Sequence, residues 1–101
     1  MAYTKVGAVN EVPSGTVKVY DVDGREIAIC NAGGDLFAID NVCSHDDAPL
    51  DQGELLDFEV ECPRHGARFD IRSGEVTEEP AYLPIETFKV RVSGDHIEVD
   101  L

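Results

Sequence analysis

The chain has 101 residues, 43% of them hydrophobic, which is enough for one domain with a modest core and leaves little room for a separate substrate pocket. With 21 acidic residues against eight basic ones, its formal charge of -13 argues against nucleic acid and against anionic membranes as partners. No segment approaches the ~18 consecutive apolar residues of a membrane-spanning helix, so we expect no membrane association.

The N-terminal segment, residues 1–5, lacks the basic, apolar and small-residue order of a secretory signal. We therefore expect a complete cytoplasmic protein whose three cysteines are kept reduced. An odd number of cysteines in that compartment favours metal binding or catalysis over structural disulfides.

The first strand-like runs, residues 16–20 and 26–30, alternate apolar and polar side chains. Between them, Asp23-Gly24 is a pair suited to the positive φ angles of a tight hairpin turn. The sequence therefore predicts a β-hairpin here, and we expect its turn to lie away from the loops described next.

Gly33-Gly34 turns the chain into a strand over residues 36–39, and two stretches then interrupt the strand pattern. The first, residues 42–53, contains Cys43 and His45, and the second, residues 61–69, contains Cys62 and His65. We expect both stretches to be loops that project from one end of a β scaffold.

The remaining strands are predicted at residues 58–60, 69–71, 88–92 and 97–101. Ser73-Gly74 and the segment 93–95 are the expected hairpin turns. A third loop, residues 80–84, has proline at both ends, which stiffens it, and it is a candidate to lie beside the two cysteine loops. No window shows a sustained 3.6-residue apolar period, so helix should be minor.

The two loops carry the groups Cys43-Ser44-His45 and Cys62-Pro63-Arg64-His65. Together they offer two thiolates and two imidazoles, a ligand set that suits zinc or an iron–sulfur centre. Small zinc modules usually place two cysteines first and two histidines last, whereas each group here is mixed. A mixed group favours a two-metal centre in which cysteines bind one metal and histidines the other, and a structural zinc module remains a remote alternative.

C-x-H, sixteen further residues and C-x-x-H closely resemble the ligand pattern of Rieske proteins. The similarity extends to the segment 62–70, to the proline loop at 80–84 and to the closing hairpin, so it covers nearly the whole chain. It implies an all-β fold, a small Rieske-type antiparallel β sandwich or barrel. Two loops and a proline loop would form a cluster-binding subdomain at about residues 42–84 of a single domain spanning 1–101.

The same resemblance implies one [2Fe-2S] cluster. Cys43 and Cys62 would bind the inner iron as thiolates, and His45 and His65 would bind the outer iron near the surface. Two ferric ions, two sulfides and two thiolates sum to zero charge, so a reduced cluster carries only one negative charge. Such a cluster is easier to reduce than an all-cysteine cluster, and reduction potentials in the family run from roughly -150 to +300 mV.

Departures from the family pattern narrow the expectation. Rieske proteins of respiratory complexes carry one additional cysteine in each loop, joined as a disulfide, where this chain has Ala48 and Arg64. The same high-potential relatives donate hydroxyl hydrogen bonds to the cluster sulfurs, where this chain has Ala67 and Phe69. Missing donors destabilise the reduced cluster, which implies a negative midpoint potential near pH 7.

The resemblance therefore implies a soluble electron carrier similar to the ferredoxin components of bacterial ring-hydroxylating dioxygenase systems. Such a protein passes single electrons from a flavin-dependent ferredoxin reductase to a terminal oxygenase in aromatic hydrocarbon catabolism, and it has no catalytic residues of its own. An alternative is a small subunit of another redox enzyme, such as nitrite reductase. A catalytic oxygenase subunit is excluded, because only His96 is left to bind a further iron.

The other candidates have ordinary interpretations. Cys30 ends an apolar strand and is expected to be a core residue, and His96 is expected on a solvated strand face. Gly53 and Gly66 suit loops whose backbone N–H groups approach cluster sulfurs closely. Asp46 and Asp47 follow His45 and are candidates for contact with a partner protein.

Overall fold

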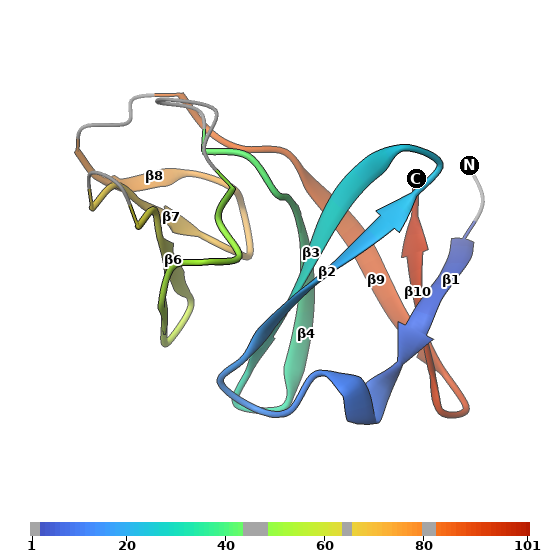
Figure 1. The fold of residues 1–101 in the computed structure, drawn as a ribbon. Coiled ribbons are helices and arrows are strands. Elements are labelled where there is room, and N and C mark those ends of the chain that lie inside the picture. The colour runs from blue at the N-terminus through green and yellow to red at the C-terminus, as the bar shows by residue number, and fades with distance from the viewer. Residues whose placement is uncertain (1–2, 44–48, 64–65, 80–82) are drawn as a thin grey trace.

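The structure, a computed structural model, describes residues 3–43, 49–63, 66–79 and 83–101. The described residues form ten strands and one short 3-10 turn (Figure 1). In chain order these are β1 (Tyr3–Ala8), η1 (Val9–Glu11), β2 (Val17–Val22), β3 (Arg25–Ala32), β4 (Asp35–Asp40), β5 (Leu55–Leu56), β6 (Glu59–Glu61), β7 (Arg68–Asp70), β8 (Val76–Glu78), β9 (Thr87–Ser93) and β10 (His96–Asp100).

The strands build two antiparallel sheets, which confirms the predicted all-β class. The larger sheet has six strands in the order β1-β10-β9-β4-β3-β2, and the smaller has four in the order β5-β6-β7-β8. Figure 1 shows the smaller sheet to one side of the larger one. Among the described residues, no helix is both long and apolar enough to cross a bilayer.

The larger sheet curls until its two outer strands, β1 and β2, approach each other. The Tyr20 hydroxyl on β2 donates a hydrogen bond of 2.7 Å to Glu11, at the end of η1. The Tyr20 ring lies so close to Gly7 of β1 that a β-carbon at Gly7 would be 2.6 Å from it. This contact joins the edges of the sheet and makes a nearly closed barrel.

The predicted hairpin between residues 16 and 30 is confirmed as β2 and β3. Asp23 and Gly24 have φ angles of 54° and 83°, and a two-residue turn of this type requires positive values at both positions. The turn nevertheless lies at the same end of the sheet as the first cysteine loop, because the Asn41 N–H donates to the Glu26 carbonyl at 3.2 Å. The expectation that this turn lies elsewhere is therefore wrong.

Two buried clusters divide the core, and β3 contributes to both because its successive side chains point to opposite faces. Ile27 and Ile29 pack inside the curled larger sheet. Ala28 and Cys30 face the other way, into a second cluster that the smaller sheet covers. β3 therefore has six consecutive buried residues from Ile27 to Ala32.

An aromatic contact links the two sheets. The rings of Phe37, on β4, and Phe58, beside β6, meet edge to face with centroids 6.0 Å apart. The Arg72 guanidinium covers the Phe58 ring at 4.4 Å and is held by hydrogen bonds to Asp70. An aromatic pair such as Phe37 and Phe58 stabilises the folded state by about 0.5 to 1.5 kcal/mol beyond the effect of the area that it buries.

The smaller sheet belongs to an excursion of the chain between two strands that are direct neighbours. β4 pairs with β9 through Ala38 and Phe88. The Asp40 N–H donates to the Glu86 carbonyl at 2.9 Å, so the chain leaves and rejoins the larger sheet at adjacent points. Both cysteine loops lie within this excursion.

Candidate metal centre

Cys43 and Cys62 are both buried, at 0% and 1% exposure, although each belongs to a loop. Cys43 lies three residues after β4, and Cys62 directly follows β6. Both are members of the buried cluster between the two sheets, together with Leu50, Ala67 and Phe69. The fold therefore brings the two candidate thiolate ligands into one apolar region that excludes water.

The second cysteine loop is the connection of a hairpin. β6 and β7 pair through Glu61 and Arg68, whose side chains are also hydrogen-bonded at 3.1 Å. Beyond this pair, the Cys62 N–H donates to the Ala67 carbonyl at 2.6 Å, and the Gly66 N–H donates to the Cys62 carbonyl at 3.0 Å. These bonds hold Gly66 and Ala67 against Cys62, at the base of the loop.

The first cysteine loop is closed by a side chain that sequence reasoning missed. Asn41 is 3% exposed, and its Oδ1 accepts hydrogen bonds of 2.9 Å from the N–H groups of Leu50 and Asp51. Its Nδ2 donates to the carboxylates of Asp51, at 3.0 Å, and Glu26, at 3.1 Å. The only signal for it in the sequence is a polar residue at the end of an apolar strand, two positions before Cys43.

Gly53 lies where the two loops meet. A β-carbon at this position would overlap the carbonyl oxygen of Glu61, the residue before Cys62. The Gly53 N–H donates to the Leu50 carbonyl at 3.0 Å, and the Gly66 N–H is used within its own turn. The structure therefore explains Gly53 by a close approach of backbone, a different reason from the expected contact with a sulfur.

Several predicted site residues lie outside the described residues. They are His45, His65, Asp46, Asp47, Ala48, Arg64 and residues 80–82 of the proline loop. In the described residues that flank these segments, Val42, Pro49, Pro63 and Leu83 are exposed. Leu50, which precedes Asp51, is instead fully buried.

The two buried thiols fit the thiolate half of a mixed cysteine and histidine centre. No three Cys, His, Asp or Glu side chains gather as a metal site within the described ranges. Cys30 is a buried thiol on β3, and burial raises its pKa to about 12. This matches the expected core role, and His96 is exposed on β10, as predicted.

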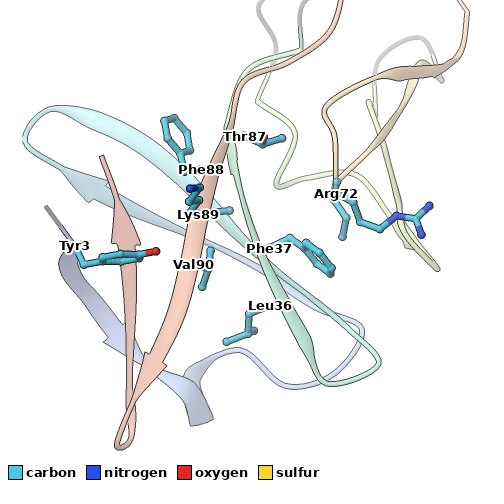
Figure 2. A pocket seen from close by; sticks show the side chains of 10 residues that line it. Tyr3, Leu36, Phe37, Arg72, Thr87, Phe88, Lys89 and Val90 are labelled. Atoms are coloured by element: carbon cyan, nitrogen blue, oxygen red, sulfur yellow. The ribbon is translucent and has the colours of Figure 1, made fainter. Parts of the chain in front are cut away.

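A groove of about 560 Å³ follows the seam between the two sheets. Figure 2 shows Phe37 on the side of the larger sheet and Arg72 on the side of the smaller one, with Lys89 and Val90 further along β9. Neither Cys43 nor Cys62 lines this groove. The groove therefore does not reach the two buried thiols.

Comparisons with known proteins bear directly on this centre. The family model described as "Rieske [2Fe-2S] domain" matches residues 2–89. The biphenyl 2,3-dioxygenase ferredoxin component of Rhodococcus jostii (strain RHA1) is 39% identical over 101 residues, which cover 100% of this chain and 94% of the relative.

Solved structures agree with that likeness. The ferredoxin of carbazole 1,9a-dioxygenase from Nocardioides aromaticivorans IC177 has a TM-score of 0.92 and 37% identity, covering 98% of this chain and 97% of that one. A chain in a complex of reduced oxygenase and oxidized ferredoxin of carbazole 1,9a-dioxygenase has a TM-score of 0.91 and 28% identity, covering 96% and 91%. A structure described as a nitrite reductase small subunit has a TM-score of 0.86 but 16% identity, which shows a shared fold alone.

Proposed function

The chain belongs to the Rieske [2Fe-2S] family, and from this premise we propose that it is a one-electron carrier, and not an enzyme, with one [2Fe-2S] cluster as its cofactor. The observation that carries the proposal is the pair of buried cysteines, each in a short loop, inside one apolar cluster. Because the [2Fe-2S] cluster supplies the redox chemistry when bound, the protein's own task is to hold that cluster, to exclude water and to leave one edge of it accessible.

We assign the ligands as Cys43 and Cys62 for the inner iron and His45 and His65 for the outer iron. The burial of both cysteines supports the first pair, since thiolates inside an apolar cluster are shielded from solvent and exchange. The spacing of each histidine from its cysteine supports the second pair. The exposed apolar residues that flank the two loops, among them Val42 and Pro63, would then surround the histidine edge.

The proposed partners are a flavin-dependent ferredoxin reductase, which supplies the electron, and a terminal oxygenase that acts on aromatic compounds. The relatives named as ferredoxin components of dioxygenase systems support this role, as does the solved complex of ferredoxin with oxygenase. The formal charge of -13 disfavours nucleic acid and anionic membranes as partners. The proposed location is the cytoplasm. The alternative, a nitrite reductase subunit, has only a shared fold in its favour.

The first test is the composition of the purified protein. We expect two irons and two acid-labile sulfides per chain, and a reduced-state paramagnetic signal whose average g value lies below that of all-cysteine clusters. Stoichiometric zinc without sulfide would overturn the proposal. Reduction by a flavin reductase and reoxidation by a dioxygenase, but not by a nitrite reductase, would then identify the class of partner.

A further inference from the structure

We propose that Asn41 is a positioning residue for the cluster, which fixes the Cys43 segment against the Cys62 segment through the turn at residues 50–53. The inference rests on the proposed function, because it assumes that both cysteines bind the cluster. Asn41 is not itself one of the four proposed ligands.

The Asn41 side chain is fully hydrogen-bonded. A side-chain amide has two N–H donors and a carbonyl oxygen with two lone pairs, and Asn41 uses all four sites. The group is almost fully buried, so a lost partner would leave an unsatisfied polar atom that water cannot reach. Asn41 is therefore held in one orientation, and it holds Leu50 and Asp51 in turn.

A chain of backbone contacts connects Leu50 to the segment that contains Cys62. The Leu50 carbonyl accepts the Gly53 N–H, and Gly53 lies directly against the Glu61 carbonyl. The Glu61 N–H donates to the Glu54 carbonyl at 2.9 Å. Because Glu61 precedes Cys62, a shift of the 50–53 turn must move Cys62 or open this contact.

The surroundings of Asn41 require an amide and not a carboxylate. The Asn41 Nδ2 lies between the carboxylates of Glu26 and Asp51, which both need a donor. Aspartate has the same shape and keeps the acceptor that binds the two loop N–H groups. It would place a third carboxylate beside the other two, and like charges repel.

Asn31 supplies a matched control inside the same sheet. It is also buried, its Nδ2 donates to the Val12 carbonyl at 2.7 Å, and its Oδ1 accepts the Gly34 N–H at 2.8 Å. It lies at the β3–β4 turn, the opposite end of β3 from Glu26. Its removal should lower the stability of the barrel without acting on the cysteine loops.

The experiment compares Asn41→Ala, Asn41→Asp and Asn31→Ala as cluster-loaded proteins. The readouts are the rate at which visible absorption is lost to an excess iron chelator, the midpoint of thermal unfolding, and hydrogen exchange at the amides of Leu50 and Asp51. For Asn41→Ala we expect cluster loss about 10- to 100-fold faster than in the wild type, with faster exchange at both amides. Asn31→Ala should lose its cluster at the wild-type rate even if its unfolding midpoint falls as far as that of Asn41→Ala.

Asn41→Asp keeps the inference testable if Asn41→Ala does not fold. It should also lose the cluster faster, and adding Asp51→Asn should recover part of the wild-type rate, because an amide donor then faces the new carboxylate. Equal rates of cluster loss in Asn41→Ala and Asn31→Ala, or no recovery in the double variant, would overturn the positioning role. A wild-type protein with no visible cluster would instead overturn the proposed function.

Discussion

The three cysteines are alike in burial and differ in what surrounds them. Cys30 lies within strand β3, with hydrogen-bonded neighbours on both sides. Cys43 and Cys62 lie in loops, next to the segments that contain His45 and His65. The position of a cysteine in the fold therefore separates a core residue from a candidate ligand where exposure does not.

Substitution of single cysteines tests this difference. Cys62→Ser should prevent stable assembly of the cluster, because a hydroxyl is a poor replacement for a thiolate. Cys30→Ser should leave the visible spectrum unchanged and lower the stability by about 1 to 3 kcal/mol, since it places a hydroxyl in the apolar core. Absorption spectra and urea unfolding measure the two effects. A bleached Cys30→Ser protein that is still folded would contradict the assignment.

The same residue gives a prediction for alkaline pH. Burial raises the pKa of Cys30 to about 12 from its ordinary value near 9. A neutral thiol is thus favoured by folding, so its contribution to stability is complete below pH 9 and is lost as the pH rises toward 12. The wild type should lose more stability than Cys30→Ala over this range in urea titrations. Equal losses of stability in the two proteins would show that folding does not raise the pKa of this thiol.

The potential is expected to respond to two buried residues of the second loop. Ala67 and Phe69 are both fully buried in the apolar residue cluster that also contains Cys43 and Cys62. Ala67→Ser and Phe69→Tyr introduce hydroxyl donors, and a donor to a cluster sulfur favours the added electron. Each variant should raise the midpoint potential by on the order of 60 mV, the equivalent of tenfold in a one-electron equilibrium. Protein-film voltammetry measures the shift, and a fall in potential would contradict it.

The two cysteine loops meet at Gly53, where the backbones can approach only because glycine has no β-carbon. Gly53→Ala places a methyl group against the Glu61 backbone, which has no rotamer by which to move away. The variant should lose about 1 to 3 kcal/mol of stability and should lose iron faster than the wild type.

Gly7→Ala is the matched control for that substitution. Its new methyl group would meet the Tyr20 ring, which lies on the far side of the barrel contact, and a ring can shift. We expect it to lower the thermal midpoint while leaving the rate of iron loss unchanged. If Gly7→Ala releases iron as fast as Gly53→Ala, the effect reflects general instability.

How far the sequence predicts these elements depends on how local their causes are. The hairpin at Asp23-Gly24 and the closing hairpin were predicted because two or three residues set the turn. β1 was missed, because a register shift between Lys5 and Gly7 breaks its alternation, and β5 has only two residues. The roles of Asn41 and Gly53 depend on contacts with segments distant in the sequence, which no local pattern contains.

For the whole molecule, charge should govern encounter with partners. A formal charge of -13 favours association with a basic surface, and such attraction is screened over about 8 to 10 Å at physiological salt. Electron transfer to the oxygenase should therefore slow as salt rises from about 20 to about 300 mM, mainly through the association rate. Stopped-flow traces that do not change with salt would limit the acidity to a role in solubility.

Charge reversal locates the docking surface. Asp46→Lys and Asp47→Lys, beside the proposed ligand His45, should slow transfer further. Asp51 is a poor probe, because its carboxylate accepts a hydrogen bond from Asn41 and its reversal would disturb the loop. Asp95→Lys is the better control, since it lies in the β9–β10 turn, at the opposite end of the larger sheet from Asp40. Equal slowing at Asp46 and Asp95 would indicate that net charge alone matters.

The adjacent departure and return of the chain at Asp40 and Glu86 has a consequence for how the molecule opens. The pairing of β4 with β9 already holds the two ends of the excursion together, so ordering the excursion requires little further loop closure. We therefore expect the part that holds the proposed iron–sulfur cluster to unfold and refold as a separate cooperative unit while the barrel persists. Loss of iron would release that unit first, and the intact barrel would keep the chain ready to accept a new cluster.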